Sequence, residues 1–302
     1  MTETHGQKAD HQHSGHRHDH EHHGHQHGDF SPAETIDMLD LEGEVLQGYW
    51  EDALSWIRRA AAGSPRARVL DLGAGTGTAA LGLAQHFSEA EVVAIDVAPE
   101  SLRRLSVKAQ ELGLGARVTG VEADLDAGWP DLGSFDLTMA SMSLHHMADP
   151  SRVLRDVLAA TSPGGLIAVA EFGEPLRFLP EDLGIGEPGF EDRLIEAVTP
   201  AQLEEMPTLG SAWAPRLTEA GWMVLDEREF RIDQNPPGHP GANRFARAWF
   251  TRLAHAKADS LAPEDRATLE ILLADVGAQS LLHRKDLRIR GVRTVTLASR
   301  AS

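Results

Sequence analysis

The stretch VLDLGAGTGT, at residues 69–78, decides the fold of this chain. A short apolar run that contains one aspartate leads into a turn with glycine at every second position, and a helical pattern starts directly after it. Glycine tolerates positive φ and lets a backbone approach a ligand closely. The N-terminus of the following helix favours a negative group or a hydrogen-bond acceptor. The stretch therefore predicts a strand, a ligand-binding turn and a helix.

The spacing of the glycines separates several kinds of nucleotide-binding turn. Gly73 and Gly75 fit the dinucleotide fingerprint G-x-G-x-x-G/A, but the last glycine falls one place early, at Gly77, and Thr78 stands where the fingerprint requires glycine or alanine. The P-loop is absent, because no lysine follows the last glycine. The carboxylate of Asp71 would repel a pyrophosphate, whereas it suits a cofactor that carries an ammonium and a sulfonium. A different nucleotide cofactor stays open as an alternative.

The residues around this turn alternate between strand and helix patterns. Short apolar runs predict strands at 68–72, 91–96, 117–123, 135–140 and 166–172, and the segments between them predict helices at 78–87, 99–112 and 151–160. The last of these strands is almost continuously apolar, as in a strand buried on both faces. Repeated strand–helix units with short turns are typical of an α/β fold with a doubly wound parallel sheet.

The segments that flank this core are predicted to cover it. Ser31 to Glu34 form a capping box with proline at the first helical position, and the helical segment that follows ends at 63–65. Residues 173–198 lose their periodicity and are predicted as a loop-rich insertion. A second capping box at 199–202 is expected to open a helix that ends near Gly221.

The C-terminal part predicts a strand pair with helices inserted between its members. We expect a strand at 224–232, a break at 236–238, helices at 244–258 and 263–276, and a last strand at 289–298. The complete sheet would then have seven strands and be mostly parallel.

The amino-acid composition excludes several classes of functional site and binding partner. The chain has 302 residues, of which 41% are hydrophobic, and no cysteine. The lack of cysteine excludes disulfides, thiolate metal sites and a cysteine nucleophile, and it favours a reducing, cytoplasmic compartment. No apolar run approaches the roughly 20 residues that cross a bilayer. The net charge of −18 argues against binding to nucleic acid or to an anionic membrane, so we expect a small-molecule partner and neither of these two.

Residues 1–29 differ in composition from the rest and hold ten of the 16 histidines. Almost nothing in this segment is apolar, so we expect a disordered tail. Imidazole can bind Ni²⁺, Cu²⁺ or Zn²⁺. A specific site also needs fixed geometry and supporting hydrogen bonds, so we predict no metal site.

The ordered series of motifs resembles the class I S-adenosylmethionine-dependent methyltransferases. Their first motif is an acidic residue followed by G-x-G-x-G, which Asp71 and the three glycines match, and their second strand ends in an acidic residue, here Asp96. An acidic residue after the third strand corresponds to Asp124. The segment after the fourth strand and the Pro-Gly-Gly before the fifth are also similar, so the resemblance covers about residues 66–172.

The resemblance implies a Rossmann-like fold, a methyltransferase activity and S-adenosylmethionine as the cofactor. Asp96 would bind both ribose hydroxyls, because a carboxylate can accept from two adjacent groups, and Asp124 would lie near the adenine amino group. The implied cofactor-binding residues are Asp71, Gly73, Ala74, Gly75, Gly77, Asp96, Val97, Asp124, Leu125, Ala140 and Ser141, with Tyr49 reaching over from the N-terminal helix.

The sequence indicates the catalytic residues less clearly than the cofactor-binding residues. His145 and His146 stand where an acceptor would lie, and a histidine can take a proton from a hydroxyl or an amine. Methyl transfer often needs only positioning and proximity, so packing or helix capping is the competing interpretation of both residues. Asn235 opens a sequence similar to the N-P-P motif of DNA amino-methyltransferases, but no aromatic residue follows, so we reject that function.

We expect a tail at 1–29 and one domain at 30–302, divided into a helical cover at 30–65, a cofactor-binding core at 66–172 and substrate-side insertions with the last two strands at 173–302. The predicted function is methyl transfer to an oxygen, nitrogen or carbon of a small molecule. The alternative is a non-catalytic protein on the same fold that binds S-adenosylmethionine or handles metals.

Overall fold

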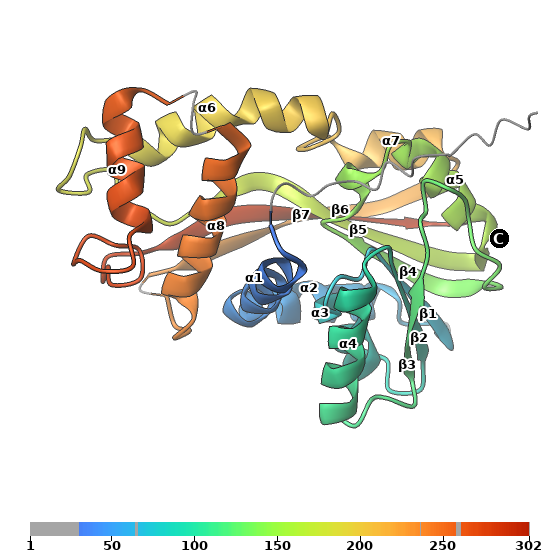
Figure 1. Ribbon diagram of the computed structural model, residues 1–302. Helices are drawn as coiled ribbons and strands as arrows, with labels where there is room; N and C mark the ends of the chain where they lie inside the picture. The colour runs from blue at the N-terminus through green and yellow to red at the C-terminus, as the bar shows by residue number, and fades with distance from the viewer. Residues whose placement is uncertain (1–29, 64–65, 236, 258–260, 302) are drawn as a thin grey trace, which may run out of the picture.

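The computed structural model describes residues 30–63, 66–235, 237–257 and 261–301. Within them one sheet of seven strands has the order β3-β2-β1-β4-β5-β7-β6 (Figure 1). The strands are β1 (Arg68–Leu72), β2 (Glu91–Asp96), β3 (Val118–Glu122), β4 (Phe135–Ser141), β5 (Thr161–Arg177), β6 (Met223–Gln234) and β7 (Ile289–Ser299). β1 to β5 are parallel, and β7 runs antiparallel to both of its neighbours. The predicted seven-stranded, mostly parallel α/β sheet is confirmed.

Helices cover both faces of the sheet. On one face α5 (Pro150–Ala159) and α7 (Trp213–Glu219) pack on Leu70, Ile167 and Val169. The opposite face carries α2 (Gln47–Ala60), α3 (Thr78–His86) and α4 (Pro99–Glu111) (Figure 1). Because successive residues of a strand point to opposite faces, the odd-numbered Val69 of β1 joins the second face while Leu70 joins the first. This alternation also places Asp71 on the second face, where the backbone N–H of Ala80 in α3 donates to its carboxylate.

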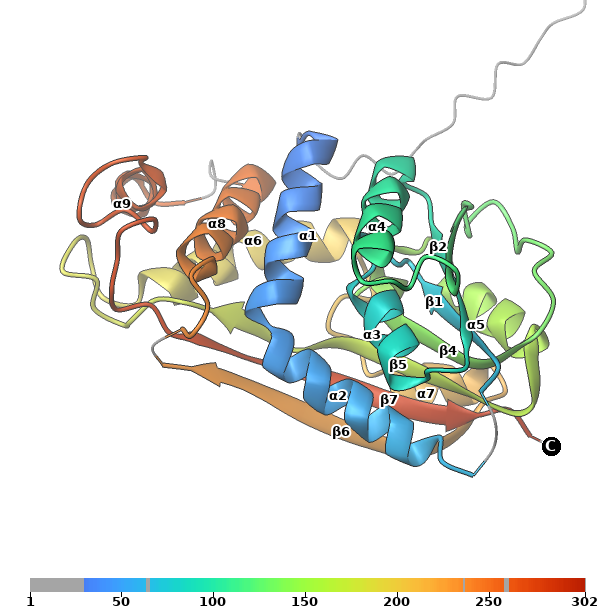
Figure 2. The ribbon, with the colours of Figure 1, turned by 90° about the horizontal axis from the view of Figure 1, so that it is seen from below.

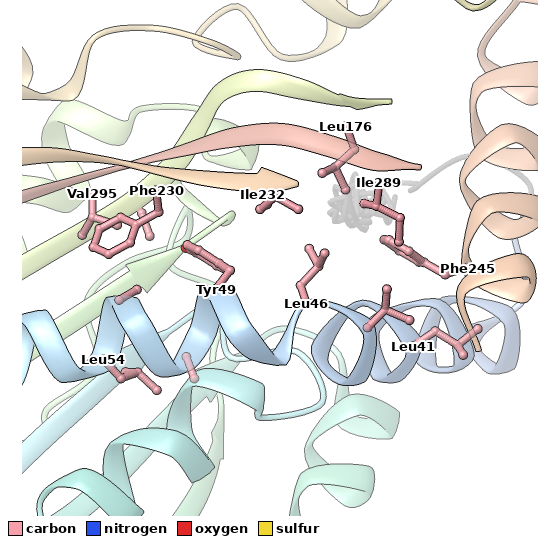
Figure 3. Packing of buried hydrophobic residues seen from close by; sticks show 14 of the residues in the cluster. Leu41, Leu46, Tyr49, Leu54, Leu176, Phe230, Ile232, Phe245, Ile289 and Val295 are labelled. Atoms are coloured by element: carbon pink, nitrogen blue, oxygen red, sulfur yellow. The ribbon is translucent and has the colours of Figure 1, made fainter. Parts of the chain in front are cut away.

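The N-terminal cover consists of two helices rather than the single one expected. α1 (Pro32–Val45) begins with the predicted capping box and ends at Leu46, where α2 follows directly. Leu46 is buried and adopts a non-helical ψ of 21°, which lets both helices turn an apolar side toward the molecule. Figure 2 shows α1 between α8 (Ala242–Lys257) and α4, with α2 crossing the face of β7 and β6. In Figure 3 Leu46 and Tyr49 point toward Phe230 and Ile232 of β6.

The loop-rich insertion predicted at 173–198 is wrong. β5 continues to Arg177, because its distal part pairs with β7 as far as Arg290, and α6 (Phe190–Glu205) begins well inside the predicted loop. The second capping box is wrong as well. Thr199 lies within α6, where its hydroxyl donates to the carbonyl of Ile195 at 2.7 Å. Burial of an apolar stripe on this helix outweighs the local signature, and the helix accommodates Pro200.

α6, α8 and α9 (Pro263–Leu273) pack in sequence around the distal parts of β5 and β7 (Figure 1). The strand and the two helices expected before the last strand are present as β6, α8 and α9. Pro236 and residue 258 of that expectation, together with the tail at 1–29, lie outside the described residues. None of the described helices is long and apolar enough to cross a bilayer.

Candidate functional site

The glycine-rich turn after β1 has little space for side chains. Gly73, Gly75 and Gly77 all have positive φ. A Cβ on Gly73 would lie 2.4 Å from Cβ of Ser143, and one on Gly77 would lie 2.0 Å from Cδ1 of Leu105. The N–H groups of Gly73 and Ala74 both donate to the carbonyl of Ile95 in β2. Glycine is required at these positions for two reasons. The segments that contain Ser143 and Leu105 leave no space for a Cβ, and the backbone has the left-handed conformation that glycine tolerates best.

α1 lies over this turn. A Cβ on Gly75 would come within 3.2 Å of Cδ1 of Leu39, and one on Gly43 of α1 would come within 2.5 Å of Oγ1 of Thr78. Asp40 ties α1 to α4 through ion pairs with Arg104, at 2.6 Å, and with Lys108, at 2.8 Å. The two ion pairs fix α1 as a cover over the turn.

Asp96 ends β2 beside the same turn. Its Oδ2 accepts from the N–H of Gly75 at 2.7 Å, and its Oδ1 accepts from the N–H of Ala98 at 2.8 Å. A carboxylate offers about four acceptor positions, so each oxygen can accept one further donor. Val97 is 54% exposed at this position. The side chain of Asp96 is thus oriented by backbone donors and still able to bind a pair of hydroxyls.

Asp71 is a buried carboxylate on the covered face of β1. Its side chain is 1% exposed, and Oδ2 has no hydrogen-bond partner among the described residues. Burial raises the pKa of this carboxyl to about 7, the backbone N–H of Ala80 opposes the rise, and the charge of Asp96 adds to it. Because burial disfavours a charged carboxylate, an ionised Asp71 in this position would be stabilised by a positively charged group next to it.

Asp124 and Leu125 follow β3. Asp124 is exposed, and its Oδ1 accepts from the N–H of Asp126 at 2.9 Å. The N–H of Ala123 donates to the carbonyl of Asp96, which brings this turn to the end of β2. Leu125 is buried in the apolar cluster on the face of the sheet that α5 and α7 cover. The two residues therefore lie at the edge of the turn region, with the aspartate on the solvent side.

The segment after β4 is held in an unusual backbone shape. Ala140 is fully buried between β1 and β5, so it offers only backbone, and Ser141 ends the strand. Met142, with φ of 54°, is the one residue other than glycine with positive φ in the described part of the chain. Its N–H donates to the carbonyl of Ala170 at 2.8 Å. Strain of this kind is maintained only where the surroundings fix it, and it clusters at functional sites.

Glu171 of β5 is the group that fixes this segment. Its Oε1 accepts from the N–H groups of Ser143 and Leu144, each at 3.1 Å, and its Oε2 lies 2.6 Å from Nδ1 of His145. The side chains of Glu171 and His145 are 2% and 4% exposed. A carboxylate that accepts at Nδ1 places the proton there and leaves Nε2 as the basic nitrogen. The ring of His146 lies 4.1 Å from that of His145, centroid to centroid.

A second group of buried polar residues lies under α1 and α2. Tyr49 is 8% exposed, and its buried hydroxyl lies beside the side chain of Ser141. Burial raises the pKa of this phenol, Glu42 and Glu171 add to the rise, and Arg293 opposes it. Arg293 of β7 is 1% exposed; its Nη2 lies 3.3 Å from Oε1 of Glu42, and its guanidinium carbon lies 4.7 Å from the centre of the Phe172 ring.

The structure thus brings Asp71, the three glycines, Asp96 and Ser141 to the carboxyl ends of the parallel strands, where α1 covers the turn and Tyr49 of α2 lies beside Ser141. Sequence reasoning missed Glu42, Glu171 and Arg293. Glu171 had a signal, because it ends the apolar run of β5 as Asp96 ends that of β2. Tyr49 also lines a shallow groove of about 290 Å³ between α2 and β6, which is separate from the glycine turn. No cluster of three histidine or carboxylate side chains that could hold a metal occurs in the described residues.

The site fits a cofactor with a cationic end and a pair of hydroxyls. The glycine turn has no room for a Cβ, the unpartnered oxygen of Asp71 suits a cation, and the carboxylate of Asp96 suits hydroxyl donors. A pyrophosphate at the same turn would be repelled by the buried carboxylate of Asp71.

Comparison with known proteins points in the same direction. A family model described as a methyltransferase domain matches residues 69–165. The malonyl-[acyl-carrier protein] O-methyltransferase of Halorhodospira halophila is 42% identical over 107 residues, which cover 35% of each chain. The demethylmenaquinone methyltransferase of Thermus thermophilus is 37% identical over 125 residues, or 40% of this chain and 56% of that protein.

A third relative, the 27-O-demethylrifamycin SV methyltransferase of Amycolatopsis mediterranei, is 32% identical over 153 residues, or 45% of this chain and 54% of that protein. The chain therefore spans about half, or less, of the length of these curated relatives. The YcgJ protein of Bacillus subtilis shares the fold, with a TM-score of 0.51 and 18% identity over 83% of this chain and 99% of that one. Together with the strand order and the glycine-rich turn, these matches show a methyltransferase domain of the class I, Rossmann-like type at residues 69–165.

Proposed function

We propose that this chain binds S-adenosylmethionine and transfers its methyl group to a small molecule. The observation that carries the proposal is Asp71, a buried carboxylate with one unpartnered oxygen beside a glycine turn that α1 covers. A carboxylate in that place is stabilised by a cation such as an ammonium group. The family match and the relatives' printed activities support the same assignment.

The residues that would hold the cofactor divide by chemistry. Asp71 would face the cationic amino-acid end, and Asp96 the ribose hydroxyls. The backbone of Gly73, Ala74, Gly75 and Gly77 would line the turn, with Val97, Asp124 and Leu125 at the adenine side and Ala140, Ser141 and Tyr49 beside the amino-acid end. When bound, S-adenosylmethionine supplies a methyl group activated by the sulfonium.

His145 is the residue of this chain best placed to remove a proton from the acceptor. Glu171 holds the ring at Nδ1 with a 2.6 Å contact and is itself fixed by two backbone donors, so Nε2 remains available as a base. An oxygen acceptor gains most from such a base, because a hydroxyl is a weak nucleophile until its proton leaves. The names of two relatives specify O-methyl transfer, which is consistent with an oxygen acceptor here.

A transfer assay tests the proposal. The purified chain is incubated with S-adenosylmethionine that carries a deuterated methyl group and with three acceptor sets: phenols and alcohols, amines, and enolisable carbonyl compounds. We expect label in a product of the hydroxyl set and formation of S-adenosylhomocysteine that requires the acceptor. Binding of the cofactor with no labelled product from any set would favour the non-catalytic alternative.

A further inference from the structure

Arg293 is an unusual residue for the middle of a buried strand. It lies among Val292, Val295 and Leu297 of β7, and its side chain is 1% exposed. A guanidinium has five N–H donors and stays protonated. In this chain Nη1 has no hydrogen-bond partner among the described residues, and Nη2 has a partner only at 3.3 Å, in Glu42. A buried guanidinium of this kind is costly unless an anion completes its hydrogen bonds.

The carboxylate that pairs with Arg293 also acts on a second arginine. Glu42 is the carboxylate that faces Arg293, and Glu42 also interacts electrostatically with Arg252 of α8. Burial lowers the pKa of Arg252, and the charge of Glu42 opposes that change. Two guanidinium groups therefore share one carboxylate at the junction of α1, α8 and β7. An anion at Nη1 of Arg293 would add a second negative partner at this junction.

Arg293 also lies on the reacting side of the site. Its guanidinium stacks on the ring of Phe172 at 4.7 Å, and His145 meets the same ring edge-on, with centroids 5.3 Å apart. The buried hydroxyl of Tyr49, beside Ser141, belongs to the same buried set, because the charge of Arg293 acts on it. His145, Phe172 and Arg293 thus form one wall, with a base at one end and an unsatisfied cation at the other.

We propose that the acceptor is a small molecule that carries a carboxylate as well as the hydroxyl to be methylated. Its carboxylate binds Nη1 of Arg293, and its hydroxyl lies toward His145. Planar guanidinium and carboxylate groups match in a two-bond geometry that an ammonium or an amide cannot reproduce. The inference rests on the proposed methyl transfer, and it names the substrate class of the same site.

Binding of benzoate, with benzamide as its neutral counterpart, tests the carboxylate site without requiring turnover. Affinities are measured by ligand-observed NMR with and without saturating S-adenosylhomocysteine. We expect benzoate to bind the folded chain at least tenfold more tightly than benzamide. We expect Arg293→Gln to weaken benzoate about ten- to a hundredfold, as for loss of a hydrogen bond to a charged group, and to leave benzamide unchanged. Arg288→Gln, which removes an exposed arginine paired with Asp233, is the matched control.

Glu42→Gln separates this proposal from a purely structural pair. If Arg293 receives the acceptor, removal of the competing carboxylate tightens benzoate severalfold. If the pair only fixes α1, Glu42→Gln and Arg293→Gln weaken benzoate equally, and the proposal is wrong. Equal affinities for benzoate and benzamide, or no benzoate binding to the folded chain at about 10 mM, would also overturn it. Should Arg293→Gln not fold, Arg293→Lys, which retains the charge, must keep a reduced preference for benzoate. Failure of S-adenosylhomocysteine to bind while benzoate binds would refute the proposed function alone.

Discussion

Replacement of Asp71 by asparagine tests the electrostatics at the centre of the site. The carboxyl has a pKa of about 7 in the folded chain and an ordinary value of 3.8, mainly because it is buried. In the unfolded chain it ionises at low pH, whereas the folded chain keeps its proton until about pH 7. Unfolding therefore releases a proton between these values, so the contribution of Asp71 to stability falls as pH rises from about 4 to 7 and is constant above.

The size of this effect follows from the two pKa values. Their difference corresponds to about 4 kcal/mol, at about 1.4 kcal/mol for each pH unit. An asparagine side chain cannot ionise and has nearly the same shape as that of aspartate. The stability of the Asp71→Asn variant relative to the wild type should therefore increase by up to about 4 kcal/mol from about pH 4 to pH 7.

Urea unfolding at pH 5, 6, 7 and 8, followed by circular dichroism, measures this difference. Other buried acids, such as Glu191, whose pKa burial also raises to about 7, contribute to both proteins and cancel in the comparison. Asp131→Asn, at an exposed position, is the matched control. Parallel stability curves for Asp71→Asn and wild type across this range would refute the reasoning, because they would mean that Asp71 is ionised at little cost.

Two further substitutions test the turn and the proposed base. Gly77→Ala should destabilise the chain by about 1–3 kcal/mol more than Gly113→Ala in urea unfolding, because both glycines have positive φ but only the first would place a Cβ against Leu105; equal losses would argue against crowding of the turn. His145→Gln should lower kcat about 10²- to 10⁴-fold in the transfer assay, with S-adenosylhomocysteine affinity within about twofold of wild type; an unchanged kcat would show that His145 only packs.

The parts of the fold that the sequence predicted are those in which local pattern and global packing agree. Residues 68–72 and 91–96 form strands with the predicted bounds, because each is a short apolar run closed by a turn residue. At 199–202 the local capping pattern conflicts with an apolar stripe that extends from Phe190 to Ala201, and burial of the stripe prevails. The cover divides at Leu46 because each half packs against different partners, which no short window of sequence reveals.

The candidate site likewise contains residues that local sequence indicates and residues that only the complete fold brings together. Asp71 and the glycines are neighbours in the sequence and indicate a turn by their spacing, and Asp96 ends the next strand, where the family resemblance assigned it to the same site. Glu42 and Arg293 are 251 positions apart and meet only because β7 inserts beside β5 and α1 folds over it. Such a pair depends on the complete topology. The acceptor half of the site could therefore not be predicted from spacing.

Calorimetric binding of S-adenosylhomocysteine to the folded chain tests the central claim most directly. Wild type is compared with Asp96→Ala and with Asp226→Ala, which removes an exposed carboxylate from the edge strand β6. We predict micromolar binding to wild type and to Asp226→Ala, and a loss of at least tenfold in Asp96→Ala, which abolishes the acceptor for the ribose hydroxyls. Absence of binding to folded wild type, or equal binding to all three proteins, would contradict a cofactor site at the glycine turn.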